Sequence, residues 1–223
     1  MGEFSLYNKS YYQKHRHGSY RSAMKILGCL TKLIDIKSMF DFGCGIGTWC
    51  LAAQELGISD VKGIDQSPYD GDHMLIPHKD YMQINLQNSV SLYSKADLVI
   101  SVEVGEHIED RYSHILVDTL CRHGDLVLFS AALPYQGGTG HVNEQPCSYW
   151  RNIFEKSGYC AFDCIRALCW EDDEVEIWYK NNCILYAKNG VHVNKFDNIH
   201  IRPPIDIIHP DMLKRILTKW GEQ

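Results

Sequence analysis

The sequence lacks the features that would place it among membrane or nucleic-acid-binding proteins. Within its 223 residues no apolar run reaches the roughly 20 residues that a membrane-spanning helix needs, so we expect no membrane partner. Positive charge is also scarce, since 22 Lys and Arg residues stand against 28 Asp and Glu residues, for a formal net charge of −6. Domains that bind nucleic acids usually carry a basic surface, and the charge balance therefore argues against a nucleic-acid partner.

Paired cysteines are absent as well. The nine cysteines are scattered, none forms a CxxC pair, and we see no signal peptide, which together predict reduced thiols and a cytoplasmic location. The closest group is Cys160, Cys164 and Cys169, which has neither zinc-site spacing nor a neighbouring pair of histidines. We interpret these three as core residues. The sequence assigns no metal ligand and leaves a metal requirement and the oligomeric state open.

What is present is an alternation of strand and helix patterns without an internal repeat or a linker. This predicts one domain over residues 1–223, with a helical cover at 1–35 and a C-terminal extension at 188–223. Alternating strands and helices indicate an α/β fold whose mostly parallel sheet has helices on both faces. We expect strands in 38–43, 61–65, 81–85, 96–104 and 125–133, helices in 21–36, 47–57, 110–124 and 145–159, and two late strands in 161–170 and 174–188.

A glycine-rich turn, "DFGCGIGT" at 41–48, follows the first expected strand. Each glycine costs roughly 0.5–1 kcal/mol relative to alanine within regular structure, so three of them suggest that a ligand approaches the bare main chain. A dinucleotide fingerprint would need a third glycine where Thr48 stands, and a phosphate loop would need a Gly-Lys-Ser/Thr ending. The turn therefore indicates a ligand without a pyrophosphate and disfavours a nicotinamide oxidoreductase.

Asp65 closes the second expected strand, 20 residues after Gly45. A carboxylate at this place can accept hydrogen bonds from both hydroxyls of a ribose. "DQSP" is also good turn chemistry, so a purely structural role is the alternative. Taken with the glycine turn, Asp65 favours a ligand that carries adenosine.

These residues resemble a known family. "DFGCGIG", "GID", "INL" and "DLVISVEVGEHI", in this order, are similar to the motifs of class I S-adenosylmethionine-dependent methyltransferases. The resemblance implies a Rossmann-like seven-stranded sheet whose last strand, "CILYAK", is antiparallel, and S-adenosylmethionine (SAM) as cofactor. It implies cofactor contacts from Tyr12, Asp41, Gly43, Gly45, Asp65, Gln66, Asn85, Leu86, Ser101, Val102 and Glu103.

The segment "AALPYQGGTGHVNEQPCSYW" is more distinctive. Together with "EVEIWYKNN" and "IIHPDM" it is similar to a bacterial methyltransferase subgroup associated with glycan and natural-product pathways. The resemblance implies methyl transfer to a small-molecule or glycan-precursor acceptor, with oxygen as the expected methylated atom. Transfer to nitrogen and a catalytically inactive SAM-binding partner subunit are the alternatives.

Two histidines are candidate general bases for a hydroxyl acceptor, because an imidazole exchanges its proton near neutral pH. His107 follows the fourth expected strand, and His141 lies in a loop with three glycines. The alternatives are a helix-capping or packing role for His107 and an ordinary glycine-rich connection around His141. Side chains expected to contact the acceptor are Glu106, Tyr135, Asn143 and Glu144.

Overall fold

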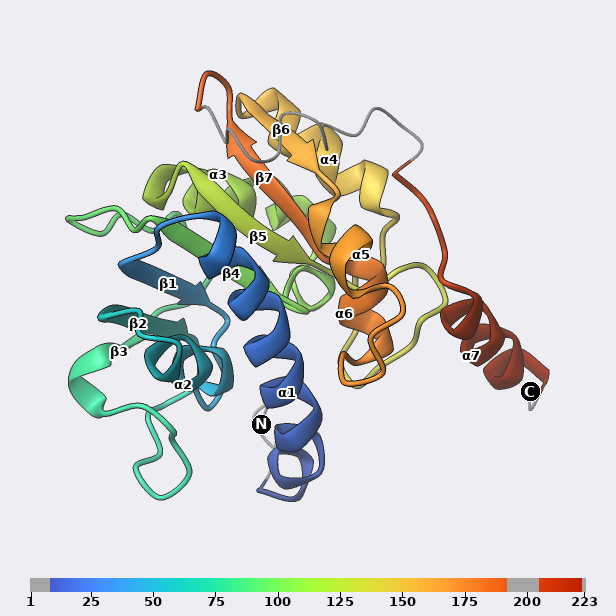
Figure 1. The fold of residues 1–223 in the computed structure, drawn as a ribbon, viewed down its shortest axis with the longest axis horizontal. Coiled ribbons are helices and arrows are strands. Elements are labelled where there is room, and N and C mark those ends of the chain that lie inside the picture. The colour runs from blue at the N-terminus through green and yellow to red at the C-terminus, as the bar shows by residue number, and fades with distance from the viewer. Residues whose placement is uncertain (1–8, 192–204, 222–223) are drawn as a thin grey trace.

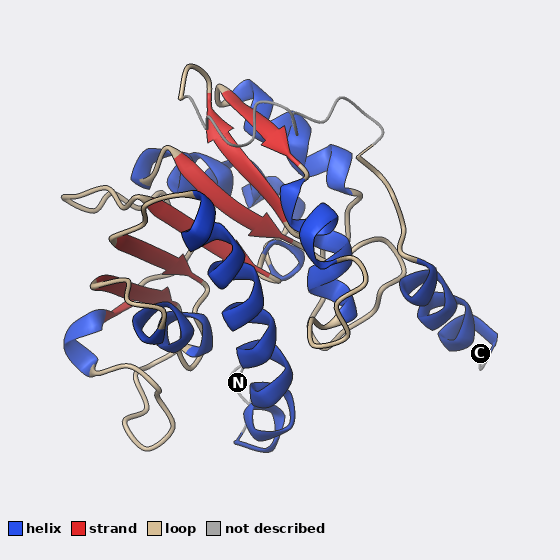
Figure 2. Cartoon of the chain, in the orientation of Figure 1, coloured by secondary structure: helices blue, strands red, loops and turns tan. Residues whose placement is uncertain are grey.

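The computed structural model describes residues 9–191 and 205–221, with side chains from 17 to 191 and from 205 to 219. Its centre is a seven-stranded sheet in the order β3-β2-β1-β4-β5-β7-β6 (Figures 1 and 2). Strands β1 to β5 pair in parallel, while β7 runs antiparallel to both β5 and β6. The predicted α/β class, the seven strands and the antiparallel last strand are confirmed.

The strands are β1 (Ser38–Phe42), β2 (Asp60–Asp65), β3 (Tyr81–Gln83), β4 (Leu98–Val102), β5 (Leu126–Ser130), β6 (Tyr159–Phe162) and β7 (Ile184–Lys188). The α-helices are α1 (Lys9–Leu33), α2 (Thr48–Glu55), α3 (Ser113–His123), α4 (Cys147–Lys156), α5 (Cys164–Cys169), α6 (Ile177–Asn182) and α7 (Pro210–Gly221). Over residues 9–191 and 205–221, three single-turn 3-10 helices join them: η2 (His78–Asp80), η3 (Gly105–His107) and η4 (Asp110–Tyr112). Within the described residues, no helix is long and apolar enough to cross a bilayer.

Helices cover both faces of the sheet because alternate strand residues are apolar on each side. Leu98 and Ile100 of β4 belong to a core shared with α1, α2 and α5, whereas Val99 belongs to a second core shared with α3 and α4. In Figure 1, α1 crosses the near face of the sheet beside α2, and α7 projects from the body near α6. Burial of both faces explains why the strands read as nearly continuous apolar runs.

The two late strands are present, but each is shorter than predicted, because each of the two segments also holds a helix. In 161–170 the strand ends at Phe162, and α5 follows, braced by a buried ion pair of Arg166 with Asp163 at 2.5 Å. In 174–188 the helix α6 precedes β7. A helical turn places Tyr179 and Asn182 three residues apart on one face, where the Tyr179 ring meets Trp49 and the Asn182 amide meets Glu103. These tertiary contacts override the strand propensity of the aromatic and β-branched residues in the segment.

Candidate functional site

The strand order reverses between β1 and β4, where ligands usually bind in open α/β sheets. The glycine turn follows β1, Asp65 ends β2, and Glu103 follows β4. Because β1, β2, β3 and β4 are mutually parallel, their carboxyl ends share one edge of the sheet. The sheet therefore brings the predicted cofactor residues on these four strands to one edge.

The glycine turn is required first by packing within the protein. Gly43 and Gly47 have φ angles of 89° and 85°, which side-chain-bearing residues rarely adopt. A Cβ on Gly43 would lie 2.3 Å from Val104 Cγ2, and one on Gly47 would lie 2.9 Å from Ile76 Cγ1. The protein's own side chains thus approach the main chain at these two glycines, in addition to any ligand.

Asp65 holds this turn in place. Its Oδ2 accepts a hydrogen bond from the Gly45 N–H at 2.9 Å, and its Oδ1 accepts one from the Ser67 N–H at 2.9 Å. The turn role considered as an alternative is therefore present. A carboxylate has about four acceptor sites, so these two bonds leave capacity for the expected ribose hydroxyls.

The residues predicted to border the adenine lie next to Asp65. Gln83 of β3 pairs with Asp65 of β2, and the Ile84 N–H donates to the Asp65 carbonyl at 2.8 Å. Asn85 is exposed and accepts the Gln87 N–H in a local turn, while Leu86 is buried. Gln66 is exposed, and its carbonyl accepts the Gln83 side-chain amide at 3.2 Å.

Asp41 and Tyr12 are two further residues predicted to contact the cofactor. Asp41 is buried under the turn, its Oδ2 accepts the Cys50 thiol at 3.5 Å, and burial raises the pKa of this carboxyl to about 7. Tyr12 lies in α1, but its side chain is outside the described residues.

The end of β4 is tied to β5 and α6 through Glu103. This residue has φ 57°, and its carboxylate accepts bonds from Ser130 Oγ at 2.8 Å, Gln136 Nε2 at 3.2 Å and Asn182 Nδ2 at 3.2 Å. Burial raises the pKa of the Glu103 carboxyl. Gln136 and Asn182 were not predicted as site residues. They lie 33 and 79 residues from Glu103, and although both stand in the distinctive segments quoted above, nothing local in the sequence pairs them with Glu103.

Ser101 and Val102, the other two predicted cofactor residues at the end of β4, differ in burial and in their contacts. Ser101 is fully buried and its Oγ has no hydrogen-bond partner, whereas Val102 is half-buried and packs against the core shared with α1 and α2.

His107 and His141 come together although 34 positions separate them. His107 ends the 3-10 turn η3 after β4, and its Nδ1 lies 3.1 Å from the Gly140 carbonyl oxygen. The His107 and His141 rings meet edge to face with centroids 5.0 Å apart. The backbone of Glu106 fixes the pairing, because its carbonyl accepts the N–H groups of Val142 at 2.9 Å and Asn143 at 3.0 Å.

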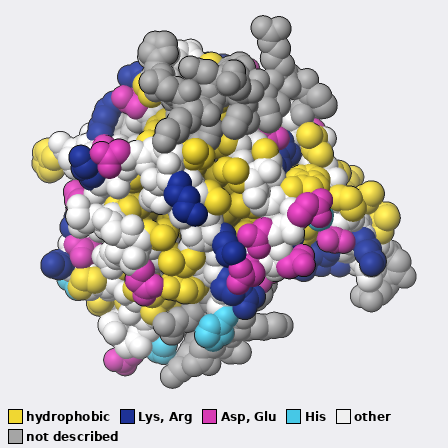
Figure 3. All heavy atoms as spheres, in the orientation of Figure 1, with side chains coloured by type: hydrophobic (Ala, Val, Ile, Leu, Met, Phe, Trp, Pro, Cys, Tyr) yellow, Lys and Arg dark blue, Asp and Glu magenta, His cyan; other side chains and the backbone are white. Residues whose placement is uncertain are grey.

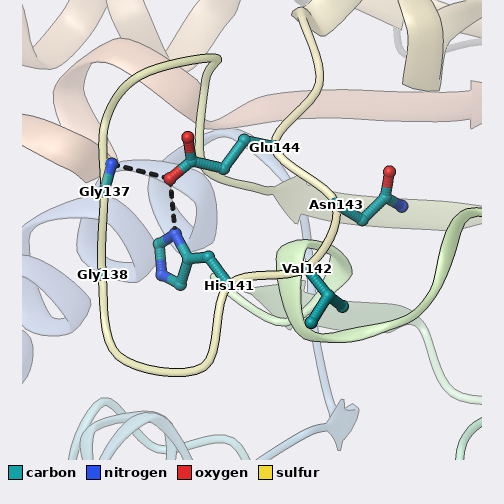
Figure 4. A pocket seen from close by; sticks show the side chains of 6 residues that line it. All are labelled: Gly137, Gly138, His141, Val142, Asn143 and Glu144. Carbon is teal, nitrogen blue, oxygen red and sulfur yellow. Dashed lines mark hydrogen bonds and ion pairs between the residues drawn. The ribbon is translucent and has the colours of Figure 1, made fainter.

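His141 and Glu144 form a hydrogen-bonded pair across the glycine-rich loop. Glu144 Oε1 lies 2.8 Å from His141 Nδ1 and accepts the Gly137 N–H at 2.6 Å (Figure 4). Its Oε2 accepts the Tyr135 N–H at 2.9 Å. The pair borders a pocket of about 360 Å³, lined by Gly137, Gly138, His141, Val142, Asn143 and Glu144. The glycine-rich loop therefore encloses a hydrogen-bonded pair of a carboxylate and an imidazole. An ordinary glycine-rich connection, the alternative considered above, would not require such a pair.

Glu106 faces this pair from the protein interior. Its side chain is 1% exposed, Oε1 lies 4.0 Å from His141 Nε2, and Oε2 has no hydrogen-bond partner. Burial, with the charges of Glu103 and Glu144, raises the pKa of this carboxyl well above its usual range. We call Glu106, His107 and His141 the Glu–His cluster.

The two remaining predicted acceptor contacts differ in exposure. Asn143 is 4% exposed, and its amide donates to Ser113 Oγ at 2.9 Å while its carbonyl oxygen accepts from Gln145 at 3.0 Å. Tyr135 is 61% exposed and has φ 70°. Asn143 thus uses its polar atoms within the protein, and Tyr135 faces solvent at the rim of the loop.

Comparisons with known proteins identify the family of the chain. A family model described as a methyltransferase domain matches residues 12–171, which is most of the chain. A search of curated protein sequences found no match.

Solved structures with the same fold belong to methyltransferases named for different acceptors. The sugar N-methyltransferase KedS8 from Streptoalloteichus sp. superimposes with a TM-score of 0.63 at 11% identity, over 84% of this chain and 94% of KedS8. Magnesium protoporphyrin IX methyltransferase ChlM from Synechocystis, with bound S-adenosylhomocysteine (SAH), gives 0.56 at 14% identity over 83% and 97%. The small RNA methyltransferase HEN1 gives 0.58 at 14% identity over 78% of this chain and 26% of HEN1. At these identities the likeness shows the fold.

Proposed function

Because this chain belongs to the methyltransferase-domain family and is a SAM-dependent methyltransferase, we propose that it methylates a hydroxyl oxygen of a small-molecule or glycan-precursor acceptor. The observation that carries the oxygen assignment is the His141–Glu144 pair at a pocket beside the end of β4. A hydroxyl benefits from a group that removes its proton, whereas more acidic acceptors need less help.

The edge of the sheet suits the cofactor. Gly43 and Gly45 carry no side chain and are only partly buried, and Asp65 is already oriented by two backbone donors. We assign the ribose to Asp65, the adenine to the segments at Gln66 and at Asn85–Leu86, and the methionine part to the glycine turn and 101–103. When bound, SAM supplies a methyl carbon activated by a sulfonium.

The acceptor proton is assigned to His141. With its Nδ1–H donated to Glu144, a neutral His141 ring carries its lone pair on Nε2. In the proposed reaction an acceptor oxygen forms a bond to the methyl carbon as the carbon–sulfur bond breaks. The electron pair of that bond stays on sulfur, giving SAH, and the hydroxyl proton passes to Nε2. Glu144 stabilises the resulting imidazolium, and His107 lies against its ring.

The acceptor class rests on charge and pocket chemistry. Acidic and basic side chains are interspersed on the face drawn in Figure 3, and the formal charge of the chain is negative. The polar pocket of about 360 Å³ has the size of a small-molecule site and suits a polyhydroxylated acceptor. KedS8 is a sugar N-methyltransferase, which makes a sugar amine the second candidate.

The test is SAH release with a panel of sugar phosphates, nucleotide sugars, amino sugars and a short single-stranded RNA. We expect release with a hydroxylated small molecule. Because general-base assistance contributes typically 10²–10⁴-fold, His141→Asn should lower kcat by about 100-fold or more. Its SAM affinity should stay within about twofold, since the cofactor residues are unchanged.

His114→Asn is the matched control, because His114 is an exposed histidine on α3 outside the pocket. It should retain full activity. Wild-type kcat in His141→Asn would contradict the base assignment, and release only with RNA or only with amines would contradict the acceptor assignment.

A further inference from the structure

The Glu–His cluster has the composition and spacing of a metal site. One carboxylate oxygen of Glu106 and one ring nitrogen each of His107 and His141 all lie within 4.8 Å of one another. Ligands that share one ion at about 2.1 Å are roughly 3–4 Å apart, so side-chain shifts of about 1 Å would close the site. We propose that Glu106, His107 and His141 bind one divalent transition-metal ion.

The donor set indicates the class of ion. Two imidazoles and one carboxylate suit first-row divalent ions such as Mn²⁺, Fe²⁺ or Zn²⁺. Three protein ligands leave further positions on the ion open, which is typical of catalytic rather than structural sites.

Both imidazoles are oriented for ligation by their other nitrogen. A carbonyl oxygen only accepts, so the Nδ1 of His107 carries the proton that it donates to Gly140, and the lone pair lies on Nε2. Glu144 fixes His141 in the same way through Nδ1 at 2.8 Å. Hydrogen bonds from the second ring nitrogen to a carbonyl or a carboxylate are the usual outer-shell partners of metal-binding histidines.

Glu106 supplies a second, independent observation. Its Oε2 is a buried side-chain oxygen without a hydrogen-bond partner, in a side chain that is 1% exposed. A buried carboxylate is costly unless it is paired or coordinates a metal. Within the described residues, the ion pair recorded for Glu106 is with His141 at 4.0 Å, and Glu103 and Glu144 add negative charge nearby. A bound cation would satisfy Oε2 and balance these charges.

Gly138 lies against the His141 ring. A Cβ on Gly138 would lie 2.1 Å from His141 Nε2 and 2.4 Å from Cε1. The missing side chain therefore lets the main chain of the loop pass close to the imidazole. Gly138→Ala should displace the His141 ring and weaken metal binding.

A bound ion would activate the acceptor by coordinating its hydroxyl groups. This part rests on the proposed methylation of a hydroxyl and changes one step of it. With an ion bound, the Nε2 lone pair of His141 would bind the metal and would not accept the hydroxyl proton. Adjacent open positions on one ion fit two neighbouring hydroxyls of a sugar or a ribose, and coordination lowers the pKa of a bound hydroxyl. The hydroxyl proton would then pass to solvent and the oxygen would bond to the methyl carbon, while the electron pair of the broken carbon–sulfur bond would stay on sulfur, giving SAH.

Metal binding can be measured without activity, by the loss of the free Mn²⁺ electron paramagnetic resonance signal on titration of the full chain treated with EDTA and then desalted. Mn²⁺ is the probe because it prefers oxygen and imidazole ligands to the nine free thiols. We expect one Mn²⁺ per chain. Glu106→Gln, His107→Asn and His141→Asn should each weaken binding at least tenfold, and Glu144→Gln about tenfold through loss of the outer partner.

The controls are Glu109→Gln and His114→Asn, which alter exposed residues of the same two types. Both should bind Mn²⁺ as the wild type does, and circular dichroism should show that every variant is folded. Less than one-tenth of an ion per chain at 1 mM Mn²⁺ would overturn the proposal. Unchanged affinity in all three ligand variants would overturn it as well.

SAH release with and without EDTA separates this inference from the proposed function. Loss of turnover in EDTA, restored by Mn²⁺, supports the metal role. Turnover that persists in EDTA overturns that role and leaves direct proton transfer to His141. Stoichiometric Mn²⁺ binding without turnover on any hydroxylated acceptor supports the site and contradicts the proposed acceptor.

Discussion

At the scale of single residues, burial decides the chemistry of Asp41. Its side chain lies beneath the glycine turn, 3% exposed, with the Cys50 thiol as a weak donor and Asp65 as a nearby acid. Burial favours the neutral form and raises the pKa of this carboxyl from 3.8 to about 7. In the folded protein Asp41 therefore keeps a proton that the unfolded chain releases above about pH 4.

This shift predicts a pH-dependent loss of stability. Because the folded pKa lies above the unfolded one, the contribution of Asp41 is greatest below pH 3.8 and falls until about pH 7. Asp41→Asn removes the ionisation, so its free energy of unfolding relative to wild type should rise by roughly 2–3 kcal/mol between pH 5 and pH 8. Urea unfolding at both pH values measures it.

The exposed Asp60→Asn, on the neighbouring strand β2, is the control and should show no such trend. A constant difference between Asp41→Asn and wild type across this range would mean that Asp41 ionises equally in both states.

At the scale of elements, the turn between β1 and α2 illustrates why glycine is needed. Gly43 combines a φ of 89° with a Cβ position only 2.3 Å from Val104 Cγ2. Gly57, after α2, has a φ of 90° but nothing within 4 Å of its Cβ position. A side chain at Gly57 would therefore meet backbone strain alone, whereas one at Gly43 would meet the same strain and a steric clash with Val104.

Alanine substitutions should reveal this difference. Gly57→Ala should cost about 1 kcal/mol, from strain alone. Gly43→Ala should cost about 1–3 kcal/mol more, because overpacking is added to the same strain. In a double-mutant cycle measured by urea unfolding, Val104→Ala should recover part of the extra cost. Equal costs for the two single glycine variants would show that the turn relaxes away from Val104.

At the scale of the whole molecule, the C-terminal helix reaches the candidate site. Lys219 of α7 donates to the carbonyl oxygens of Gln136 at 2.6 Å and Gly137 at 3.2 Å, across 83 and 82 residues of chain. These two residues begin the loop that carries His141 and Glu144. The extension at 188–223 therefore contributes to the position of this loop.

Removing the anchor should affect the acceptor more than the cofactor. Lys219→Met should raise the KM for the acceptor several-fold, because the loop loses two hydrogen bonds, while the SAM affinity changes less than about twofold. Steady-state kinetics and calorimetry measure the two effects. Lys214→Met, an exposed lysine on the same helix, should leave both unchanged. An unchanged KM in Lys219→Met would show that the loop holds its position without α7.

Three features could be predicted from neighbouring residues alone: the alternation of strands and helices, the glycine turn after β1 and the acid at the end of β2. Such features follow from local periodicity and backbone preference, which neighbours in the chain settle together. The same local information gave strands for the segments that hold α5 and α6, because the contacts of Tyr179 with Trp49 and of Asn182 with Glu103 are long-range.

The acceptor side of the site, by contrast, is built by contacts between segments that are far apart in the chain. His107 and His141 were separate candidates in the sequence, and Glu106 and Glu144 were candidate acceptor contacts. The sheet order places β4 beside β5, so the segments that follow these two strands meet. The Glu106 carbonyl then joins them through the N–H groups of Val142 and Asn143. Their meeting produces the oriented imidazoles and the buried carboxylate, because such an arrangement depends on which strands are neighbours in the sheet.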